Sequence, residues 1–275
     1  MFYSFGEVLF DCFDDVRVMG GAAFNVAAHL ASLGSQVTLI SAVGNDRSGE
    51  EIINEITKRG IGSSFVKKID NADTGKVMVT VDQQGLASYE ILFPVAWDFI
   101  DFEKSYEQDS YLIFGTLALR NGESRAALMR NFEKFSKRVF DINLRPPYYS
   151  KELIDRLVKN VHVLKLNEDE LNILCEYYQL SREEVVSELF NSECLEIMLI
   201  TKGAEGAELL SKDGERLHKK PGYVEIVDTV GCGDAFLAGF LHHYYTNKDS
   251  LEESLARAIN LSEKVAAQRG AVPFC

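Results

Sequence analysis

The chain is predicted to fold as an α/β protein with a doubly wound, mostly parallel sheet and helices on both faces. Short, apolar, β-rich runs alternate along it with segments whose apolar residues recur at i, i+3 and i+4. Strands separated in this way by helices are typical of right-handed βαβ units, in which consecutive strands lie parallel. Over 275 residues, 46% are hydrophobic and 26% charged, which excludes disordered, collagen-like and small disulfide-linked classes.

The expected strands are short runs rich in Val, Ile, Leu and Phe. In chain order they are residues 5–10, 36–41, 111–116, 138–143, 161–166, 195–201 and 223–227. The expected helices are the amphipathic segments 22–33, 48–59, 123–137, 151–160, 168–178, 181–190, 235–245 and 251–268. Gly34 and Gly60 follow two of these helices, where glycine commonly ends a helix in a left-handed conformation.

Two regions, 8–19 and 74–93, interrupt the alternation, because they contain strand patterns with no helix between neighbours. Lys76–Asp82 and Leu86–Phe93 flank the sequence Gln-Gln-Gly at 83–85, which predicts a hairpin. These strands could form a small sheet of their own, or they could extend the main sheet in an antiparallel way.

We expect the first arrangement, with residues 12–19 and 74–96 forming a small β-sheet lid. Such a lid would project over the carboxyl edge of the main sheet, where ligands bind in open α/β folds. The sequence contains no internal repeat and no Pro/Gly-rich linker, so residues 1–275 are expected to form one domain with the lid inserted in it.

The charge of the chain argues against nucleic-acid and membrane partners. Lys and Arg number 29 against 42 Asp and Glu, for a net charge of −13, and such a field repels phosphate backbones and anionic lipid. No run of eighteen apolar residues occurs, and the amino terminus lacks the basic region of a signal peptide. The five cysteines are scattered without metal-type spacing, which is typical of reduced thiols and predicts a cytoplasmic location.

The most informative segment is 228–236, which reads D-T-V-G-C-G-D-A-F between a predicted strand and a predicted helix. Gly231, Cys232 and Gly233 would leave backbone N–H groups uncrowded at a helix amino terminus, where the helix dipole favours an anion. Asp234 would face the same point and could accept a proton from a hydroxyl that attacks phosphorus. The alternative is that Asp234 only caps the helix. The chain contains neither a G-x-x-x-x-G-K-[ST] loop nor a G-x-G-x-x-G fingerprint.

Segment 228–236 resembles the carboxyl-terminal D-T-x-G-A-G-D signature of the ribokinase-like (PfkB) carbohydrate kinases, with Cys232 in place of the commoner alanine. Four further segments resemble the family in the same order: G-G-A-A-F-N-V-A at 20–27, V-G-N-D at 43–46 followed by Gly49, N-E-D-E at 167–170 and T-K-G-A-E-G at 201–206. Segments 6–9, 115–118 and 141–145 look most like those of fructokinases. The resemblance covers most of the chain.

This resemblance implies ATP-dependent phosphorylation of a small sugar at its terminal hydroxymethyl group, with fructose as the preferred acceptor. It implies that Asp234 is the catalytic base and that Gly231, Cys232 and Gly233 stabilise the phosphoryl group in transfer. The sugar-binding residues would be Asp11, Gly20, Gly21, Asn25, Asn143, Arg145 and Asp234. The nucleotide-binding residues would be Lys165, Asn167, Thr201, Gly203, Gly206, Gly231, Gly233 and Asn260.

The resemblance also implies two cations. Glu170 would act through water on Mg²⁺ bound to the phosphates, and the backbone carbonyls of Asp228 and Val230 would line a possible K⁺ site. Several of these residues have simpler alternative roles. Asp11 could be a solvated turn residue and Arg145 a surface residue. Three others could be ordinary helix residues with no part in the site: Asn25, Glu170 and Asn260.

Alternatives remain open for the substrate. Ribose, 2-keto-3-deoxygluconate and nucleosides are phosphorylated by kinases of this fold, and Tyr89, Phe93 and Trp97 could stack on a base. A sugar acid would need cations, but the lid segments offer little beyond Arg17 and Lys76. A non-catalytic sugar-binding regulator should have lost Asp234 or its glycines, and both are present. Relatives often pair through their lids, so a homodimer is a further expectation.

Overall fold

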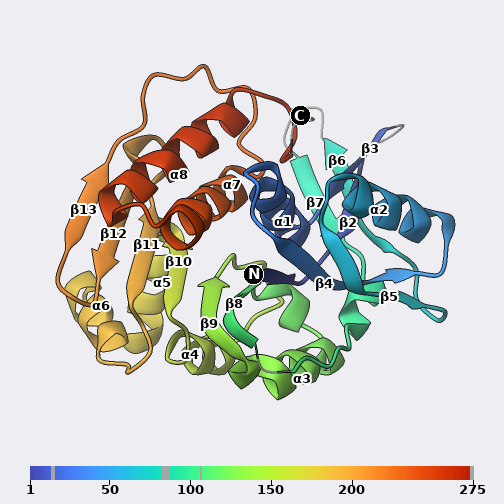
Figure 1. The fold of residues 1–275 in the computed structure, drawn as a ribbon, viewed down its shortest axis with the longest axis horizontal. Coiled ribbons are helices and arrows are strands. Elements are labelled where there is room, and N and C mark those ends of the chain that lie inside the picture. The colour runs from blue at the N-terminus through green and yellow to red at the C-terminus, as the bar shows by residue number, and fades with distance from the viewer. Residues whose placement is uncertain (14–15, 82–86, 106, 273–275) are drawn as a thin grey trace.

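A nine-stranded sheet forms the centre of the computed structural model, which describes residues 1–13, 16–81, 87–105 and 107–272 (Figure 1). Its strand order is β13-β12-β11-β10-β9-β8-β1-β4-β5. The strands are β1 (Phe2–Phe5), β4 (Val37–Gly44), β5 (Gly62–Ile69), β8 (Glu107–Phe114), β9 (Phe135–Asp141), β10 (Val163–Asn167), β11 (Ile197–Thr201), β12 (Ala207–Ser211) and β13 (Arg216–Lys219). All neighbours from β11 to β5 pair in parallel, and only β12 and β13 are antiparallel, which confirms the mostly parallel sheet.

Helices cover both faces of this sheet, as the alternating pattern predicts (Figure 1). One face packs against α1 (Ala22–Ser32), α2 (Arg47–Lys58), α7 (Cys232–Leu241) and α8 (Leu251–Ala266). The other packs against α3 (Gly122–Asn131), α4 (Lys151–Val158), α5 (Glu168–Tyr178) and α6 (Arg182–Phe190). Neighbouring strand residues enter opposite layers: Ile113 packs with the first group and Phe114 with the second.

A separate four-stranded sheet lies beside the main one, in the order β3-β2-β6-β7. Its strands are β2 (Leu9–Phe13), β3 (Val16–Gly20), β6 (Gly75–Val81) and β7 (Ala87–Ile91). The antiparallel pairing of β6 with β7 confirms the predicted hairpin strands, whereas its turn at 83–85 lies outside the described residues. The expectation of a separate sheet is therefore confirmed, but the sheet begins at Leu9 and ends at Ile91 rather than spanning 12–19 and 74–96.

The predicted first strand, residues 5–10, is wrong, because the chain changes sheets at Gly6. β1 ends at Phe5, and Gly6 has a φ of 150°. The Ser41 hydroxyl donates to the Gly6 carbonyl at 2.6 Å, which holds the chain as it leaves the main sheet. Asp11 therefore lies on β2 of the small sheet and not at the end of a central strand.

The predicted strand at 223–227 is also wrong. Among the described residues this part of the chain has no strand partner, and the amides of Val227 and Asp228 donate instead to the Ala266 carbonyl at the end of α8. Apolar side chains consequently face solvent in this loop, with Tyr223 99% and Ile226 63% exposed. A β-like sequence pattern without a neighbouring strand edge did not produce a strand.

Smaller differences concern boundaries. The helix expected at 123–137 ends at Asn131, and the strand expected at 138–143 begins at Phe135 after a short 3₁₀ turn, Phe132–Lys134. α7 begins at Cys232 and continues into a π-helical turn, His242–Asn247. Gly34 and Gly60 have φ values of 87° and 73°, as expected for residues that end helices. Strands β5, β12 and β13 were not predicted.

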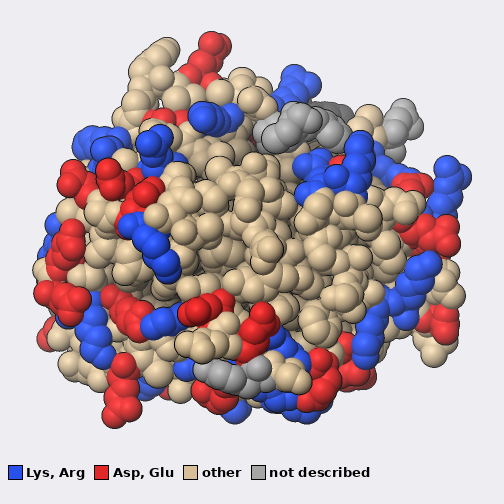
Figure 2. Space-filling view, in the orientation of Figure 1, with Lys and Arg blue, Asp and Glu red and all other residues tan. Residues whose placement is uncertain are grey.

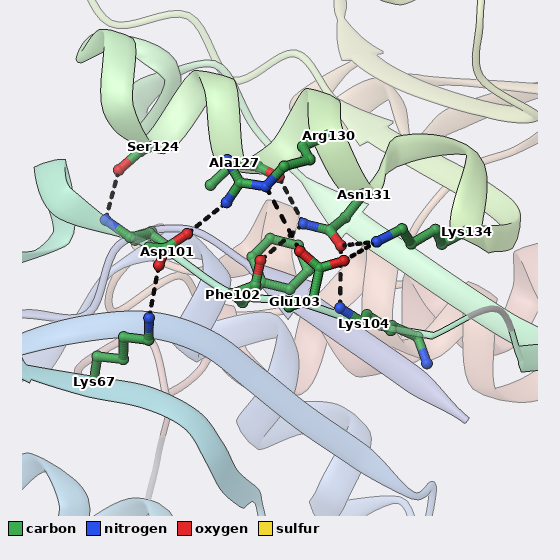
Figure 3. A network of polar contacts seen from close by, with 11 residues as sticks. Lys67, Asp101, Phe102, Glu103, Lys104, Ser124, Ala127, Arg130, Asn131 and Lys134 are labelled. Carbon is green, nitrogen blue, oxygen red and sulfur yellow. Dashed lines mark hydrogen bonds and ion pairs between the residues drawn. The ribbon is translucent and has the colours of Figure 1, made fainter.

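The return of the chain from the small sheet is fixed by polar contacts with α3 (Figure 3). The Asn131 side chain donates to the carbonyls of Phe102 and Ala127 and accepts from the amide of Lys104. Asp101 accepts from Lys67 on β5 at 2.8 Å and from Arg130 on α3 at 2.5 Å. The segment that leads from the small sheet into β8 is thus tied to two layers of the core.

Charged side chains surround the face drawn in Figure 2, whose centre is largely uncharged. Acidic and basic groups alternate around that margin rather than forming one patch of a single sign. No helix within the described part of the chain is long and apolar enough to cross a membrane.

Candidate active site

Asp234 lies in the first turn of α7 and is only 8% exposed. The Asn25 side chain, from the first turn of α1, donates an N–H to Asp234 Oδ2 at 2.8 Å. The other atom of this amide, Asn25 Oδ1, is buried without a partner among the residues described. The structure therefore joins two of the predicted sugar-site residues and leaves an acceptor beside them for a hydroxyl.

The turn before α7 exposes backbone donors. Gly231 has a φ of 79°, and a Cβ there would lie 2.5 Å from the Cα of Ala271, so only glycine fits this position. Within the described structure the amides of Gly231 and Gly233 have no hydrogen-bond partner, while that of Cys232 makes a long bond of 3.3 Å to the Thr229 carbonyl. Unpaired amides at a helix amino terminus can bind a phosphoryl group.

Lys165, the middle residue of β10, lies directly against this turn. Its Nζ donates to both carboxylate oxygens of Asp141 at 2.8 Å, and it lies 3.2 Å from the point where a Cβ on Gly233 would stand. Burial alone would lower the pKa of Lys165, but Asp141, Glu170 and Asp234 outweigh it and raise the pKa above its usual value. A permanent cation therefore stands beside the unpaired amides.

The environment of Asp234 suits a base that works near neutral pH. Burial raises its pKa to about 7, and the neighbouring Asp141 carboxylate also acts to raise it. Asn25 and Lys165 oppose this rise by stabilising the charged form. Glu7, buried after β1 and bonded to the Ala22 amide at 3.1 Å, adds a further small upward contribution.

Asp11 projects from the small sheet toward the start of α1. A Cβ on Gly20 would lie 2.5 Å from Asp11 Oδ2, and one on Gly21, whose φ is 106°, would lie 2.5 Å from the Glu7 carbonyl. Burial raises the pKa of Asp11 to about 6, and its carboxylate has no hydrogen-bond partner in the described ranges. Both glycines are therefore required for the close approach of β2, β3 and α1.

Asn143 and Arg145 follow β9 and lie in different settings. Asn143, with a φ of 42°, lines a small hollow with Glu7, Gly115 and Asp141. Arg145 is exposed, and it donates only to the carbonyl of its neighbour Leu144 at 3.1 Å. The structure thus brings Asn143 to the site and leaves the guanidinium of Arg145 free of a carboxylate partner within the described residues.

Glu170 and Asn167 cap α5 reciprocally. Asn167 Oδ1 accepts from the Glu170 amide, and Glu170 Oε2 accepts from the Asn167 amide, both at 2.8 Å. Glu170 Oε1 accepts from the Leu144 amide at 2.9 Å. Each Glu170 oxygen is therefore already occupied once, which fits a water-mediated contact with Mg²⁺ better than direct ligation. Within the described chain no three His, Cys, Asp or Glu side chains form a metal-binding group.

The four remaining residues predicted for the nucleotide fall in two places. Thr201 ends β11, and Gly203 and Gly206 form the tight turn after it, where a Cβ on Gly206 would lie 2.0 Å from the Lys219 carbonyl. Asn260 instead lines a hollow of α1, α7 and α8 with Leu33, His243 and Val224, and no residue of the 201–206 turn takes part in it.

Asp228 braces the loop before α7. Its carboxylate accepts from the amides of Val230 and Gly270, each at 3.0 Å, which ties the loop to the chain beyond α8. Cys232 is half-buried, and its thiol lies 3.9 Å from the Asp228 carbonyl oxygen. Burial raises the pKa of this thiol, so it is neutral at ordinary pH.

Two acidic residues of the site were not assigned a role from the sequence. Glu7 and Asp141 were noted only as members of the segments that look like those of fructokinases. Neither lies at a distance in sequence from another charged residue that would predict a contact. Their contacts with Ala22 and Lys165 join residues 15 and 24 positions apart, which a single sequence does not reveal.

Comparison with known proteins gives one family over nearly the whole chain. The model of the pfkB family carbohydrate kinases matches residues 2–274. A probable fructokinase of Arabidopsis thaliana is 26% identical over 98% of this chain and 92% of its own, and a ribokinase of Dictyostelium discoideum is 27% identical over 93% and 86%.

Solved structures of such kinases share the fold. A fructokinase of Vibrio cholerae in its apo form superimposes with a TM-score of 0.86 at 25% identity, covering 98% of this chain and 99% of that one. A sugar kinase of Pyrococcus horikoshii in complex with ATP gives 0.82 at 25% identity, covering 99% and 94%. The ribokinase-like fold is therefore confirmed, and the chain belongs to the pfkB family of carbohydrate kinases.

Proposed function

We propose that this chain transfers the γ-phosphoryl group of ATP to the terminal hydroxymethyl oxygen of fructose, giving fructose 6-phosphate and ADP. The observation that carries the proposal is the buried carboxylate of Asp234 beside the unpaired amides of Gly231 and Gly233. A base and an anion cradle at one helix terminus are the two parts that phosphoryl transfer to an alcohol needs.

In the proposed reaction Asp234 accepts the proton of the hydroxymethyl group. The sugar oxygen forms a bond to the γ-phosphorus as the bond to the β-phosphate oxygen breaks, and ADP leaves. The amides of Gly231, Cys232 and Gly233 and the ammonium of Lys165 stabilise the charge on the transferring group. Mg²⁺, bound to the phosphates with Glu170 reached through water, would neutralise further charge, and K⁺ could bind the carbonyls of Asp228 and Val230.

The sugar is proposed to lie between Asn25 and Asp11, under the small sheet as a lid. Asn143 would contribute from the β9 side, and Arg145 would face the phosphate path. Closure of the sheet would exclude water, which otherwise competes with the sugar for the phosphoryl group. Asn167, Thr201, Gly203 and Gly206 are proposed for the nucleotide, and Asn260 is proposed for its adenine.

The small sheet also offers an apolar surface. Phe13 and Val16 form a cross-strand pair, and Val18 pairs with Asp11, so all three lie on the face that carries Asp11. They are 40%, 62% and 42% exposed, respectively. We propose that a second copy of this chain covers part of this face, in a cytoplasmic homodimer without nucleic-acid or membrane partners.

A panel assay tests the substrate. ADP release is measured with MgATP and fructose, ribose, 2-keto-3-deoxygluconate or a nucleoside, with and without K⁺. We expect fructose to give the highest kcat/KM, because the carboxylate of Asp11 favours a neutral polyol over an acid. A tenfold preference for one of the other acceptors would overturn the choice of fructose but not the kinase class. Absence of ADP release with every acceptor would favour a sugar-binding regulator.

Asp11→Asn tests the sugar site. Loss of a charged hydrogen bond to substrate is expected to raise the KM for sugar by ~10- to 100-fold, with a smaller effect on kcat. Because the pKa of Asp11 is about 6, the carboxylate is ionised above that pH, and the wild-type KM should rise as pH falls below it. In the variant this rise should be absent.

Glu90→Gln is the matched control, because Glu90 lies on the opposite face of the same sheet. Asp11 pairs with Val77, whereas Glu90 pairs with the next residue, Met78, and neighbouring strand residues face opposite sides. An equal rise in KM in both variants would remove Asp11 from the sugar site.

A further inference from the structure

Asp141 is a buried carboxylate at the carboxyl end of β9 to which the proposed reaction gives no part. Its side chain is 8% exposed, as is that of its partner Lys165 on the neighbouring strand β10. Both oxygens accept from the Lys165 ammonium at 2.8 Å, so the two groups form a bidentate pair at the edge of the sheet that faces α7.

This pair uses two of the three N–H groups of the ammonium. The remaining side of the ammonium is turned to the first turn of α7, since Nζ lies 3.2 Å from the position of a Cβ on Gly233. The Gly233 amide has no partner in the part of the chain that is described. One ammonium and one backbone amide therefore stand beside the same point, next to Asp234.

Three carboxylates attract the Lys165 ammonium, and the strongest of these attractions decides where the ammonium lies. Asp141, Glu170 and Asp234 all act on the ammonium, but only Asp141 bonds to it. Asp234 faces Asn25 from α1, Asp141 from β9, Lys165 from β10 and Glu7 from the segment after β1. If Asp141 lost its charge, the ammonium would be drawn toward the carboxylates that remain, and Asp234 would then be partly neutralised as a base.

We infer that Asp141 is a positioning residue for phosphoryl transfer: it holds the Lys165 ammonium on the phosphate side of the α7 turn and away from the base. The inference rests on the proposed function. Asp141 touches neither substrate in this arrangement. It acts through Lys165, and it separates the cation that stabilises the phosphoryl group from the carboxylate that accepts the proton.

Asp141→Asn tests the inference through two measurements on the same variant: kcat and the pH dependence of kcat/KM. We expect kcat to fall by ~10- to 100-fold, the usual scale when a group that contacts the reacting centre is misplaced. We also expect the acid limb of the kcat/KM–pH profile to move to lower pH. The sign follows from charge: removing the Asp141 anion and bringing Lys165 closer both favour the ionised form of Asp234, so Asp234 stays deprotonated at a lower pH.

Lys104→Met is the control for loss of an ion pair away from the site, a pair in which the Glu107 side chain is 45% exposed. Lys104 is 5% exposed on its side chain and donates to Glu107 at 2.6 Å, at the amino-terminal start of β8 and hence at the opposite edge of the sheet. This variant is expected to lose stability without any movement of the acid limb. An unchanged limb and an unchanged kcat in Asp141→Asn would overturn the inference.

Asp141→Asn leaves a buried lysine without its partner, which can prevent folding. The double variant Asp141→Asn/Lys165→Met removes both charges and is expected to fold while remaining as slow as Lys165→Met alone. Recovery of wild-type kcat in the double variant would show that the pair serves only stability. These outcomes are separate from the proposed function: the panel of acceptors decides the choice of fructose, and the kinase class fails if the wild-type enzyme releases no ADP with any acceptor.

Discussion

Asp234→Asn is expected to reduce kcat by at least ~10²-fold while sugar binding largely persists, because the amide cannot accept the proton of the attacking hydroxyl. The change keeps the size of the side chain and its place beside Asn25, which can rotate its amide to bond the new group. Turnover is measured by coupled ADP release, and sugar affinity by titration calorimetry on the same preparation.

The wild-type pH profile provides a second reading of the same residue. With a pKa of about 7, Asp234 is largely protonated at pH 6 and ionised at pH 8, so kcat/KM should fall about tenfold per pH unit below 7. A base at its ordinary carboxylate pKa would give a flat profile across this range. The pH below which kcat/KM falls therefore distinguishes a buried base from an exposed one.

Asp249→Asn is a suitable control, since Asp249 lies beyond the far end of α7 and its carboxylate bonds His243 at 2.8 Å. It should retain normal turnover. Near-normal kcat in Asp234→Asn itself would remove the base from the proposed reaction and leave Asp234 as a helix residue only.

The sequence predicted the parts of this site that depend on local chemistry. Segment 228–236 contains both glycines of the turn, at 231 and 233, and the acid at 234. The turn, the start of the helix and the direction in which the carboxylate points therefore follow from nine residues. Asp11 was expected near the sugar but was placed on the wrong strand, because the crossing of the chain between sheets at Gly6 depends on Ser41, a contact across 35 positions.

The remaining features depend on tertiary contacts. Residues 223–227 have a strand pattern, but β13 ends at Lys219 and the amides that follow pair with the end of α8. Asn260 lines a hollow with Leu33, Val224 and His243, residues far apart in the chain that no local pattern brings together. The Asp141–Lys165 pair needs the register of β9 against β10, which no pattern within either strand specifies.

Arg120→Met is expected to lower the free energy of unfolding by about 3–5 kcal/mol. This is the usual cost of removing one partner of a buried ion pair, because the other charge stays buried without compensation. Arg120 and Asp98 have side chains that are 2% and 0% exposed and share two hydrogen bonds of 2.7 and 2.8 Å. The same guanidinium donates to the Leu92 carbonyl at 2.7 Å, at the end of the small sheet. Its loss would leave the Asp98 carboxylate buried with no cation.

The measurement can use the one tryptophan of the chain. The Arg120 guanidinium lies 3.9 Å from the centre of the Trp97 ring, so Trp97 fluorescence reports unfolding at the pair itself. The urea midpoint should fall at constant slope, because the exposed surface of unfolding is unchanged. Lys67→Met, which breaks the exposed pair with Asp101, should change stability by less than ~1 kcal/mol.

The double variant Arg120→Met/Asp98→Leu distinguishes an uncompensated charge from lost packing. If the cost of Arg120→Met comes from the stranded carboxylate, removing that carboxylate should recover much of the stability, as replacement of buried pairs by apolar residues often does. Both variants would lack the hydrogen bond to the Leu92 carbonyl at the end of the small sheet. The KM for sugar is therefore expected to exceed the wild-type value in both, even where stability returns. A double variant as unstable as the single one would instead assign the cost to the aromatic packing of the guanidinium against Trp97, Phe93 and Tyr148.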